Sequence, residues 1–488
     1  MSVWQGATRI ERALWPWMLP VVLALAGCAV GPNYVPPKTA TPQGWHSQLQ
    51  NGLVSGGMDP NILASWWTTL DDPVLSGLIK RAVAGNLDLK QARARVREAR
   101  ARRQGAQGAF FPTLDAAGSA TWSSRGAEGV RTVNSETYAA NFDAGWELDL
   151  FGGIRRSVEA AQANLEASGE DLRDTLVSLL AETALNYVEV RTFQARLAAA
   201  EASLKTQDET YQLTVWRSQA GLGDDLAVEQ ARYNLENTRS QIPSLRTGLE
   251  KAMNRVAVLL GEAPGQVHAE LEQPQPIPVP PAEVAVSVPA DVLRRRPDIR
   301  RAERNLAAQT ARVGVATADL YPRLTLNGSI GLEALSLGDL SSGSWIASGG
   351  PRLSLPLFNT TIRPNIKVQS ALQEQALLQY ETAVLNALEE VENALVACAQ
   401  EQRRRDNLRE AMKAAQAAAE LAQYKYQAGL TDFSNVLDAE RSLLSFQDQL
   451  QQSDGTVTSN VIRLYKALGG GWTSMAVALA SSEAGQQH

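Results

Sequence analysis

Residues 138–150, with the sequence YAANFDAGWELDL, alternate between apolar and polar side chains. Tyr138, Phe142 and Trp146 fall on one face of an extended chain, while Asn141 and the acidic residues fall on the other. A period of two predicts a β-strand that lies between an apolar and a polar environment. A run of about 9–13 residues is long enough to cross a bilayer when the strand is tilted.

Three further segments, 114–123, 324–333 and 345–355, show the same alternation. They complete two predicted β-hairpins, 113–150 and 323–357. Aromatic residues that suit the interfacial girdles of a membrane barrel are Trp122, Tyr138, Trp146 and Trp345. The pattern is typical of a water-filled barrel with its apolar side chains outward. The alternative is a soluble two-sheet sandwich with the same alternation.

Four strands cannot close a barrel, because about eight is the practical minimum. An open sheet edge is not viable in lipid, since its backbone groups would lack partners. A membrane barrel must therefore be shared between copies of the chain. Two copies would give about eight strands and a filled interior, and three would give about twelve and an open lumen. The residues favour an oligomer without choosing between these numbers.

Long Ala-rich segments with helical periodicity flank each hairpin. They are 73–110, 153–218 and 225–260 in the first half and 290–320, 363–427 and 432–468 in the second. As a helix, the segment 153–218 would be about 100 Å long, which predicts a rod or tube of coiled-coil pairs. Pro243 is expected to interrupt and kink its helix. A filamentous coiled coil would explain the helices but not the strands.

The two halves of the chain share landmarks at a nearly constant offset. Gln-Ala-Gly-Leu at 219–222 recurs at 427–430, and Leu-Gly at 260–261 recurs at 468–469. This order of matches predicts an internal duplication. The predicted boundaries are a first repeat over 66–272, a Pro-rich linker over 273–289, a second repeat over 290–472 and a disordered tail over 473–488.

Residues 1–27 are predicted to be a lipoprotein signal peptide. A basic start is followed by an apolar segment that is too short for an ordinary membrane span. Leu-Ala-Gly-Cys at 25–28 resembles a lipobox, which predicts N-acyl and S-diacylglycerol groups on Cys28. Residues 28–65 are then expected to be an extended, lipidated segment. The alternative is a buried cysteine in an N-terminal helix.

Composition argues against several classes of function. The formal net charge is −6 and no basic patch is expected to dominate, which disfavours a nucleic-acid partner. The three His are far apart and the six Met are scattered, so no metal site is predicted. Without a nucleophile–base constellation or a phosphate-binding loop, the chain is predicted not to be an enzyme and to need no cofactor beyond the lipid. Cys398 is expected to be an inert residue of a helix.

Several motifs run through the chain from Cys28 to Trp472. They are Cys28–Tyr34, Trp66-Trp67 with Asp72-Pro73, Trp146–Gly152, Arg295–Ile299, Glu390–Leu395 and Tyr465–Trp472. Together they resemble the TolC-like outer-membrane efflux lipoproteins of the NodT/OprM type. The resemblance implies an α+β membrane protein: a homotrimer with a 12-stranded β-barrel, four strands per chain, continued by a helical coiled-coil barrel. It also implies a periplasmic adaptor and an inner-membrane pump of the resistance-nodulation-division class as partners.

The same resemblance implies a gate at the periplasmic end, where inner helices coil inward. The matching residues are Tyr426, Asp432, Asn435 and Asp438. Asp438 matches a gate acid of the family, Asp432 is an alternative ring acid, and Asn435 departs from the Asp of some members. The helix breaks at Gly221 and Gly429 are expected at this end, in contact with the adaptor. The plainer alternatives are solvated helix ends, an N-cap at Asp432 and turns that require glycine.

The predicted function is passive export of small solutes, such as drugs or other toxic compounds, from pump and adaptor to the exterior. Two alternatives are a type I protein-secretion tunnel and a non-conducting envelope scaffold. No pocket signature specifies the cargo. The predicted location is the cell outer membrane, with the chain lipid-anchored and extending into the periplasm.

Overall fold

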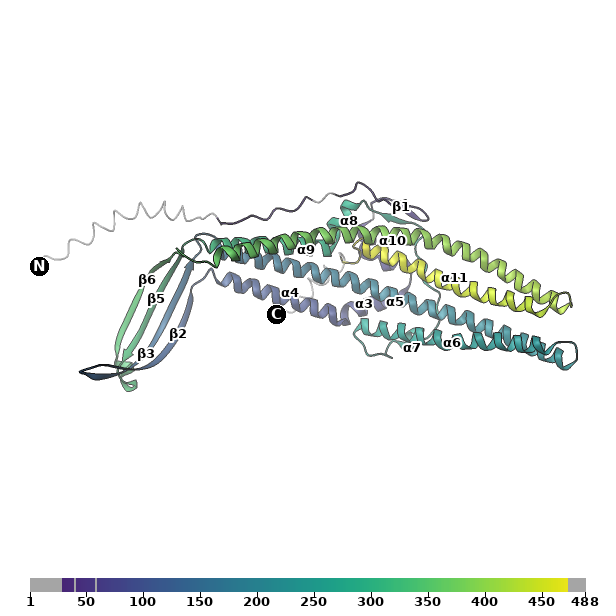
Figure 1. Cartoon of the computed structure of the whole chain (residues 1–488), viewed down its shortest axis with the longest axis horizontal. Helices are drawn as coiled ribbons and strands as arrows, with labels where there is room; N and C mark the ends of the chain where they lie inside the picture. Colours follow the sequence, from purple (N-terminus) through teal and green to yellow (C-terminus); the bar gives the residue numbers. More distant parts are fainter. Residues whose placement is uncertain (1–28, 39–40, 58, 473–488) are drawn as a thin grey trace. The chain divides into compact units, whose positions relative to one another are not determined.

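The computed structural model describes residues 29–38, 41–57 and 59–472 (Figure 1). The predicted signal peptide, Cys28 and the predicted tail lie outside these residues. The chain divides into two compact units. The first contains the residues up to Lys38, Arg95–Gly169 and Arg301–Glu381, and the second contains Thr39–Ala94, Glu170–Arg300 and the residues from Thr382 onward. Each unit therefore takes residues from both halves of the sequence.

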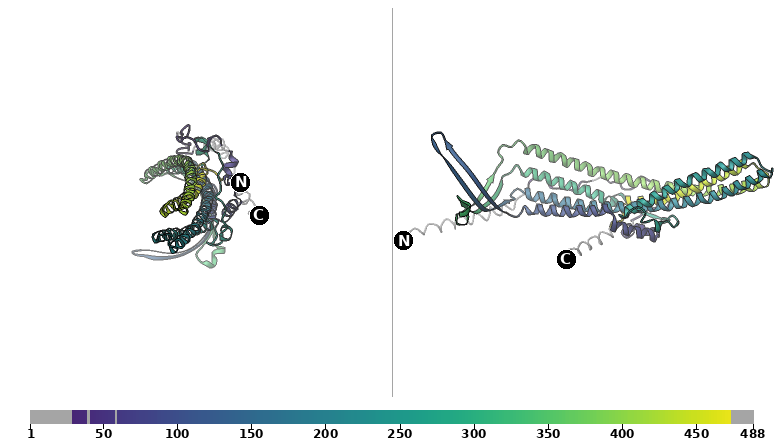
Figure 2. Two further views of the ribbon diagram at one scale, coloured as in Figure 1. Left: turned by 90° about the vertical axis from the view of Figure 1, so that its right-hand side faces the viewer. Right: turned by 90° about the horizontal axis from the view of Figure 1, so that it is seen from below.

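A four-stranded antiparallel sheet belongs to the first unit (Figures 1 and 2). Its strands are β2 (Thr113–Ala127), β3 (Val130–Leu148), β5 (Arg323–Ala334) and β6 (Ser344–Ser354), with the short helix η2 (Leu337–Ser342) between the last two. The order is β2-β3-β5-β6, so β2 and β6 are the edges. Pro351 lies in β6, where an edge strand tolerates the missing N–H group.

The register of the sheet separates an apolar face from a polar face, as the alternation predicted. Phe142 is paired with Ala116 on one side and with Ile330 on the other. The next residue, Asp143, is paired with Asp115 and Ser329. Because paired residues point to the same side of a sheet, the apolar residues of the predicted alternation share one face in all four strands.

Four helices supply the rest of the first unit. They are α4 (Leu87–Gly108), α5 (Gly153–Gln219), α9 (Pro297–Ala318) and α10 (Ile362–Gln427), and each of them continues into the second unit. The N-terminal segment is fixed to them by buried Arg156, whose Nε donates to the Val30 carbonyl at 3.2 Å and whose Nη2 donates to Asn33 Oδ1 at 2.6 Å. The Tyr34 hydroxyl donates to Glu303 Oε1 at 3.0 Å.

The second unit has its own hydrophobic core. The remaining elements belong to it: β1 (Leu53–Ser55), α2 (Pro60–Ala64), η1 (Trp66–Leu70), α3 (Pro73–Gly85), α6 (Asp225–Leu260), α7 (His268–Leu271), β4 (Val284–Val286), α8 (Pro289–Arg295) and α11 (Phe433–Ala467). β1 and β4 pair in parallel. Trp66 is fully buried and stacks on Tyr465 at 5.6 Å between ring centroids. The Trp66-Trp67 motif therefore packs the core. Helix α2 departs from the extended chain expected over 28–65.

Two predicted helices are each divided in the structure. The segment 73–110 breaks at Asn86, whose Oδ1 accepts from Leu89 N at 2.9 Å and so caps α4. The segment 290–320 breaks at Arg296, because the residue before Pro297 is driven out of the helical region. Pro243, expected to interrupt its helix, lies inside α6, which the structure describes as one helix.

Among the described residues, no helix combines the length and the apolar character that a membrane span requires.

Candidate functional site

The polar face of the sheet borders a cavity of about 460 Å³. Side chains that line it come from all four strands and include Thr113, Asp115, Asp143, Asn327, Ser329 and Ser348. Hydroxyl, amide and carboxylate groups favour water over lipid. This face is therefore suited to an aqueous space.

The apolar face carries aromatic rings at two levels of the sheet. Tyr138 is paired with Ala120 and Ala334. Trp122 and Trp345, both largely exposed, lie near this level. Trp146 lies eight residues further along β3, about 26 Å away at ~3.3 Å per residue, and its Nε1 donates to the Phe110 carbonyl at 2.9 Å. The predicted girdle residues thus form two groups along the strands.

The two long helix hairpins of the second unit end in turns of the same geometry, at the right of Figure 1. Gly221 ends α5 with φ +70°, and Gly429 ends α10 with φ +71°. Leu222 N donates to the Arg217 carbonyl at 2.8 Å, and Leu430 N donates to the Lys425 carbonyl at 2.9 Å. These bonds satisfy the last helical carbonyls, and the left-handed backbone favours glycine. Both glycines are required by the turn itself.

Tyr426, a predicted gate residue, is a packing residue within this chain. Its ring lies 5.1 Å from the ring of Phe433, and the guanidinium carbon of Arg217 lies 4.7 Å from its centroid. Phe433 is buried in a cluster with Val436, Leu437 and Ala231. The cluster joins residues of α6 and α11, and Tyr426 extends it to α10.

The predicted gate acids are exposed, with Asp432 at the N-cap of α11 and Asp438 within that helix. Asp438 forms an ion pair with Arg441 at 3.7 Å, and its side chain is 76% exposed. Such a pair contributes little to stability. Asp432 occupies the N-cap of α11, but its side chain accepts no capping hydrogen bond. Asn435 Nδ2 donates to Thr431 Oγ1 at 2.9 Å. Both acids are thus available to solvent in this chain.

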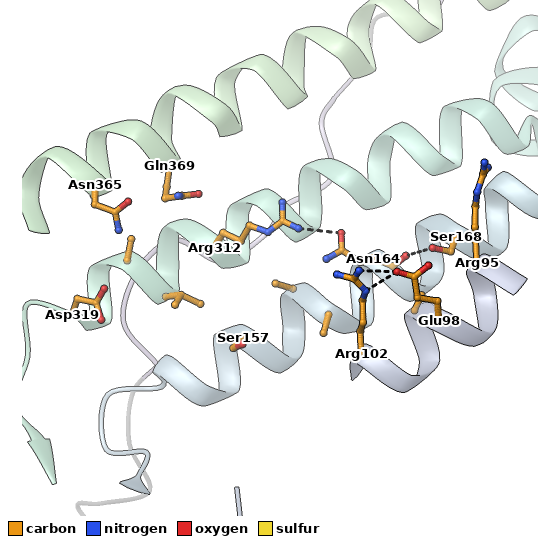
Figure 3. Close-up of a pocket in the computed structure, with 15 residues that line it drawn as sticks. Arg95, Glu98, Arg102, Ser157, Asn164, Ser168, Arg312, Asp319, Asn365 and Gln369 are labelled. Atoms are coloured by element: carbon orange, nitrogen blue, oxygen red, sulfur yellow. Dashed lines mark hydrogen bonds and ion pairs between the residues drawn. The ribbon is translucent and has the colours of Figure 1, made fainter. Parts of the chain in front are cut away.

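A larger cavity, of about 780 Å³, lies in the helical part of the first unit (Figure 3). Arg95, Glu98 and Arg102 reach it from α4, and Arg312 reaches it from α9. Helix α4 contains seven basic and two acidic residues. It is a basic surface that the expectation of no dominant basic patch missed. The number of Arg residues within 93–103 was the signal that could have revealed it.

Cys398 is a free, buried thiol in α10. Burial raises the pKa of this thiol to about 12, so it carries no charge at neutral pH. This agrees with the expectation of an inert residue. Among the described residues, no three His, Cys, Asp or Glu side chains are grouped to hold a metal ion.

Comparison with known proteins decides the family. The model of the family described as "Outer membrane efflux protein" matches residues 78–262 and again residues 288–470. The chain belongs to the outer membrane efflux protein family.

Several named proteins are similar to this chain over nearly its whole length. Nodulation protein T of Rhizobium leguminosarum bv. trifolii is 34% identical over 463 residues, which cover 93% of this chain and 97% of the relative. The cation efflux system protein CusC of Escherichia coli K12 is 32% identical over 462 residues, covering 92% and 98%. The structure of the outer-membrane channel OprN is similar with a TM-score of 0.84 at 38% identity, covering 91% of this chain and all of that one.

Membership of this family establishes the coarse function. The chain is an outer-membrane efflux channel protein of the TolC-like class, located in the outer membrane. The predicted family and location are confirmed. The mixed α/β, largely helical architecture is also that of the structural relatives.

Proposed function

We propose that three copies of this chain form the outer-membrane channel of a tripartite efflux pump, with a 12-stranded β-barrel continued by a helical coiled-coil barrel. The observation that carries the proposal is a four-stranded sheet with one polar face, one apolar face and two edges, β2 and β6. Pairing β2 of one copy with β6 of the next would remove both edges. Closure in this way satisfies the backbone groups that lipid would leave without partners.

The aromatic levels support the membrane placement of this barrel. The outward apolar band of such barrels is about 25 Å tall and has an aromatic girdle at each border. Tyr138 and Trp146 lie on the apolar face, about 26 Å apart along β3. Trp122 and Trp345 belong with Tyr138, and Trp146 marks the border nearer the helices.

An internal duplication accounts for the repeated hairpin-and-helix order. The family model matches two successive segments of similar length, which supports the two repeats. The turns at Gly221 and Gly429 repeat even the backbone hydrogen bonds. In the proposed channel both turns lie at the periplasmic end, where they contact the adaptor.

The channel is passive and is driven by its partners, a periplasmic adaptor and an inner-membrane pump of the resistance-nodulation-division class. Small toxic solutes are the proposed cargo, and a relative is named for cation efflux.

N-acyl and S-diacylglycerol groups on Cys28 add a lipid anchor. Incorporation of labelled palmitate, abolished by Cys28→Ala, tests the anchor.

The proposed gate is a ring of carboxylates contributed by three copies. Asp438 is the stronger candidate because its carboxylate is largely exposed and its one ionic partner among the described residues, Arg441, is 3.7 Å away. Three carboxylates near an axis favour cations and repel anions. Asp432 is the alternative ring acid.

The test is planar-bilayer conductance of the detergent-extracted protein, with its oligomeric mass measured first. We expect a trimer with small conductance steps that grow in Asp438→Ala and stay unchanged in Asp432→Ala. The reverse result would transfer the gate to Asp432. No conductance from folded trimers would exclude the channel and favour the scaffold. Co-purification of a protein-secretion ATPase in place of the pump would favour the secretion tunnel.

A further inference from the structure

The walls of the 780 Å³ cavity carry charged side chains, and no aromatic, leucine or isoleucine side chain lines it. A cavity between four helices is ordinarily filled by large apolar side chains. Here the lining consists of arginines, two carboxylates, amides, hydroxyl groups, four alanines and one valine, from α4, α5, α9 with the residue after it, and α10 (Figure 3). All of the lining residues belong to the first unit, so its geometry is internal to one compact body.

The carboxylates in this lining are neutralised by arginines. Glu98 pairs with Arg102 at 2.7 Å. Asp319 pairs with Arg323, which stands outside the lining. The Glu98–Arg102 pair therefore adds no net charge to the cavity, and the lining as a whole carries one more arginine than it has carboxylates.

The guanidinium of Arg312 is held in place by two hydrogen bonds to uncharged side chains. Its Nη1 donates to Gln309 Oε1 at 2.9 Å and its Nη2 donates to Asn164 Oδ1 at 3.4 Å. Both partners are neutral amides, so within the described residues they orient the guanidinium without neutralising it. A positioned guanidinium is well matched to a carboxylate, which it binds through two parallel N–H groups.

Helix α4 strengthens the positive potential on the opposite wall. It carries seven basic and two acidic residues in a chain whose net charge is −6. Arg95, Glu98 and Arg102 lie on the side of α4 that lines the cavity, so these three side chains carry one more positive than negative charge. Charges of one sign in a recess with low-dielectric walls raise the local concentration of the opposite ion.

We infer that this cavity is a weak binding layer for solutes that carry carboxylate groups, with Arg312 as the cation that binds them. The inference rests on the proposed function, because in a trimeric channel three such layers would border the conduit. Binding must be weak enough to release the solute, as conduction requires. The layer would bind anionic solutes that have already passed the carboxylates at the periplasmic end, which repel anions.

Block of the planar-bilayer current by citrate, a tricarboxylate, tests the inference, with spermidine as a cation of matching valence. We expect citrate to block the wild-type channel and spermidine to block it less. Arg312→Gln should raise the half-blocking citrate concentration at least about threefold, since it removes charge-assisted hydrogen bonds. Arg312→Lys should preserve part of the block, because the charge remains.

Arg97→Gln is the matched control. Arg97 lies on α4 but outside the cavity lining, about 200° around the helix from Arg95. The Arg97→Gln substitution removes one positive charge from the same unit as Arg312→Gln does. Because Arg97 lies outside the cavity lining, this substitution should leave the block by citrate unchanged. Equal effects of Arg312→Gln and Arg97→Gln, or equal block by citrate and spermidine, would overturn the binding layer and leave the channel intact.

A wild-type protein that is trimeric but does not conduct would overturn the proposed function separately. Citrate binding to the same trimers by titration calorimetry then decides the cavity by itself. Heat that is lost in Arg312→Gln and kept in Arg97→Gln supports a carboxylate site. No heat from the wild type refutes it.

Discussion

The turns that end the two long helix hairpins share a backbone conformation and differ in the side chains around them. Gly221 and Gly429 have nearly the same φ, and the next residues, Leu222 and Leu430, are 71% and 74% exposed. Three residues after each glycine stands an aspartate. Asp224 Oδ1 accepts from Leu226 N at 3.1 Å and caps α6, whereas the side chain of Asp432 makes no such bond.

The helices after the two turns differ in burial. Phe433 is buried against α6, while Asp225, at the equivalent position 208 residues earlier, is exposed. Both hairpin ends also expose apolar residues, Trp216 and Leu226 in the first and Tyr424 and Leu430 in the second. The comparison teaches that the backbone requires glycine at both turns, while the side chains around the two turns differ. The difference lies in Phe433, which is buried in the second hairpin, whereas its counterpart in the first hairpin is exposed.

The largest difference in stability between the two hairpins should come from Phe433→Ala. Removing the ring leaves a cavity in the cluster and should lower the local opening free energy of α11 by about 3–5 kcal/mol. Asp225→Ala, at the equivalent exposed position, should lower that of α6 by no more than about 1 kcal/mol. Amide hydrogen exchange of residues 225–235 and 433–443 measures both. Similar losses in the two hairpins would mean that the packing difference is not real.

Replacing the turn glycines should have a smaller and symmetric effect. An added Cβ meets no atom within 4 Å at Gly221 or at Gly429, so only the left-handed backbone is penalised. Gly221→Ala and Gly429→Ala should each cost about 1–2 kcal/mol of local opening free energy. Exchange of the last helical turns of α5 and α10 checks this. A loss at one turn that clearly exceeds the other would show that the shared backbone is not equally required.

The strands were predictable because burial on one face imposes a period of two. Phe142 and Asp143, adjacent in sequence, fall on opposite faces as the alternation required. The turn glycines were predictable because few other residues adopt a positive φ. The break at Asn86 was not, since it depends on a side-chain cap that no periodicity records.

The candidate sites were less predictable than the elements that carry them. Tyr426 was expected at a gate, yet its contacts with Phe433 and Arg217 depend on which helices become neighbours. The basic helix α4 was missed because its arginines are spread around the helix and the net charge of the chain is negative. The functions of Asp432, Asp438 and the glycine turns stay predictions, because they depend on further copies and partners.

The capping difference predicts a further, smaller asymmetry. Asp224→Ala removes a hydrogen bond to the first turn of α6 and should cost about 0.5–2 kcal/mol. Asp432→Ala removes none and should leave the exchange of α11 unchanged. The first turns of the two helices, compared by hydrogen exchange, provide the measurement. A clear loss in Asp432→Ala would show that Asp432 caps α11 in the assembled protein.

The smallest effect should be a dependence on pH that belongs to the second hairpin alone. Burial raises the pKa of the Glu440 carboxyl, one oxygen of which accepts from Thr210 Oγ1 at 3.2 Å. The equivalent residue of the first hairpin, Arg232, is exposed. Because the pKa is higher in the folded state, the stabilisation by this carboxyl is complete in acid. It is lost as the pH rises through the folded pKa.

Glu440→Gln keeps a neutral side chain at every pH and so isolates this contribution. At neutral pH the variant should open less readily than the wild type, and below the unfolded pKa of glutamate the two should converge. Because the side chain is only partly buried, the difference is expected to be modest. Hydrogen exchange of residues 436–444, corrected for intrinsic rates at each pH, measures it, with Arg232→Gln as the control. A constant difference between variant and wild type across the pH range would assign the effect to the lost Thr210 contact and not to the buried charge.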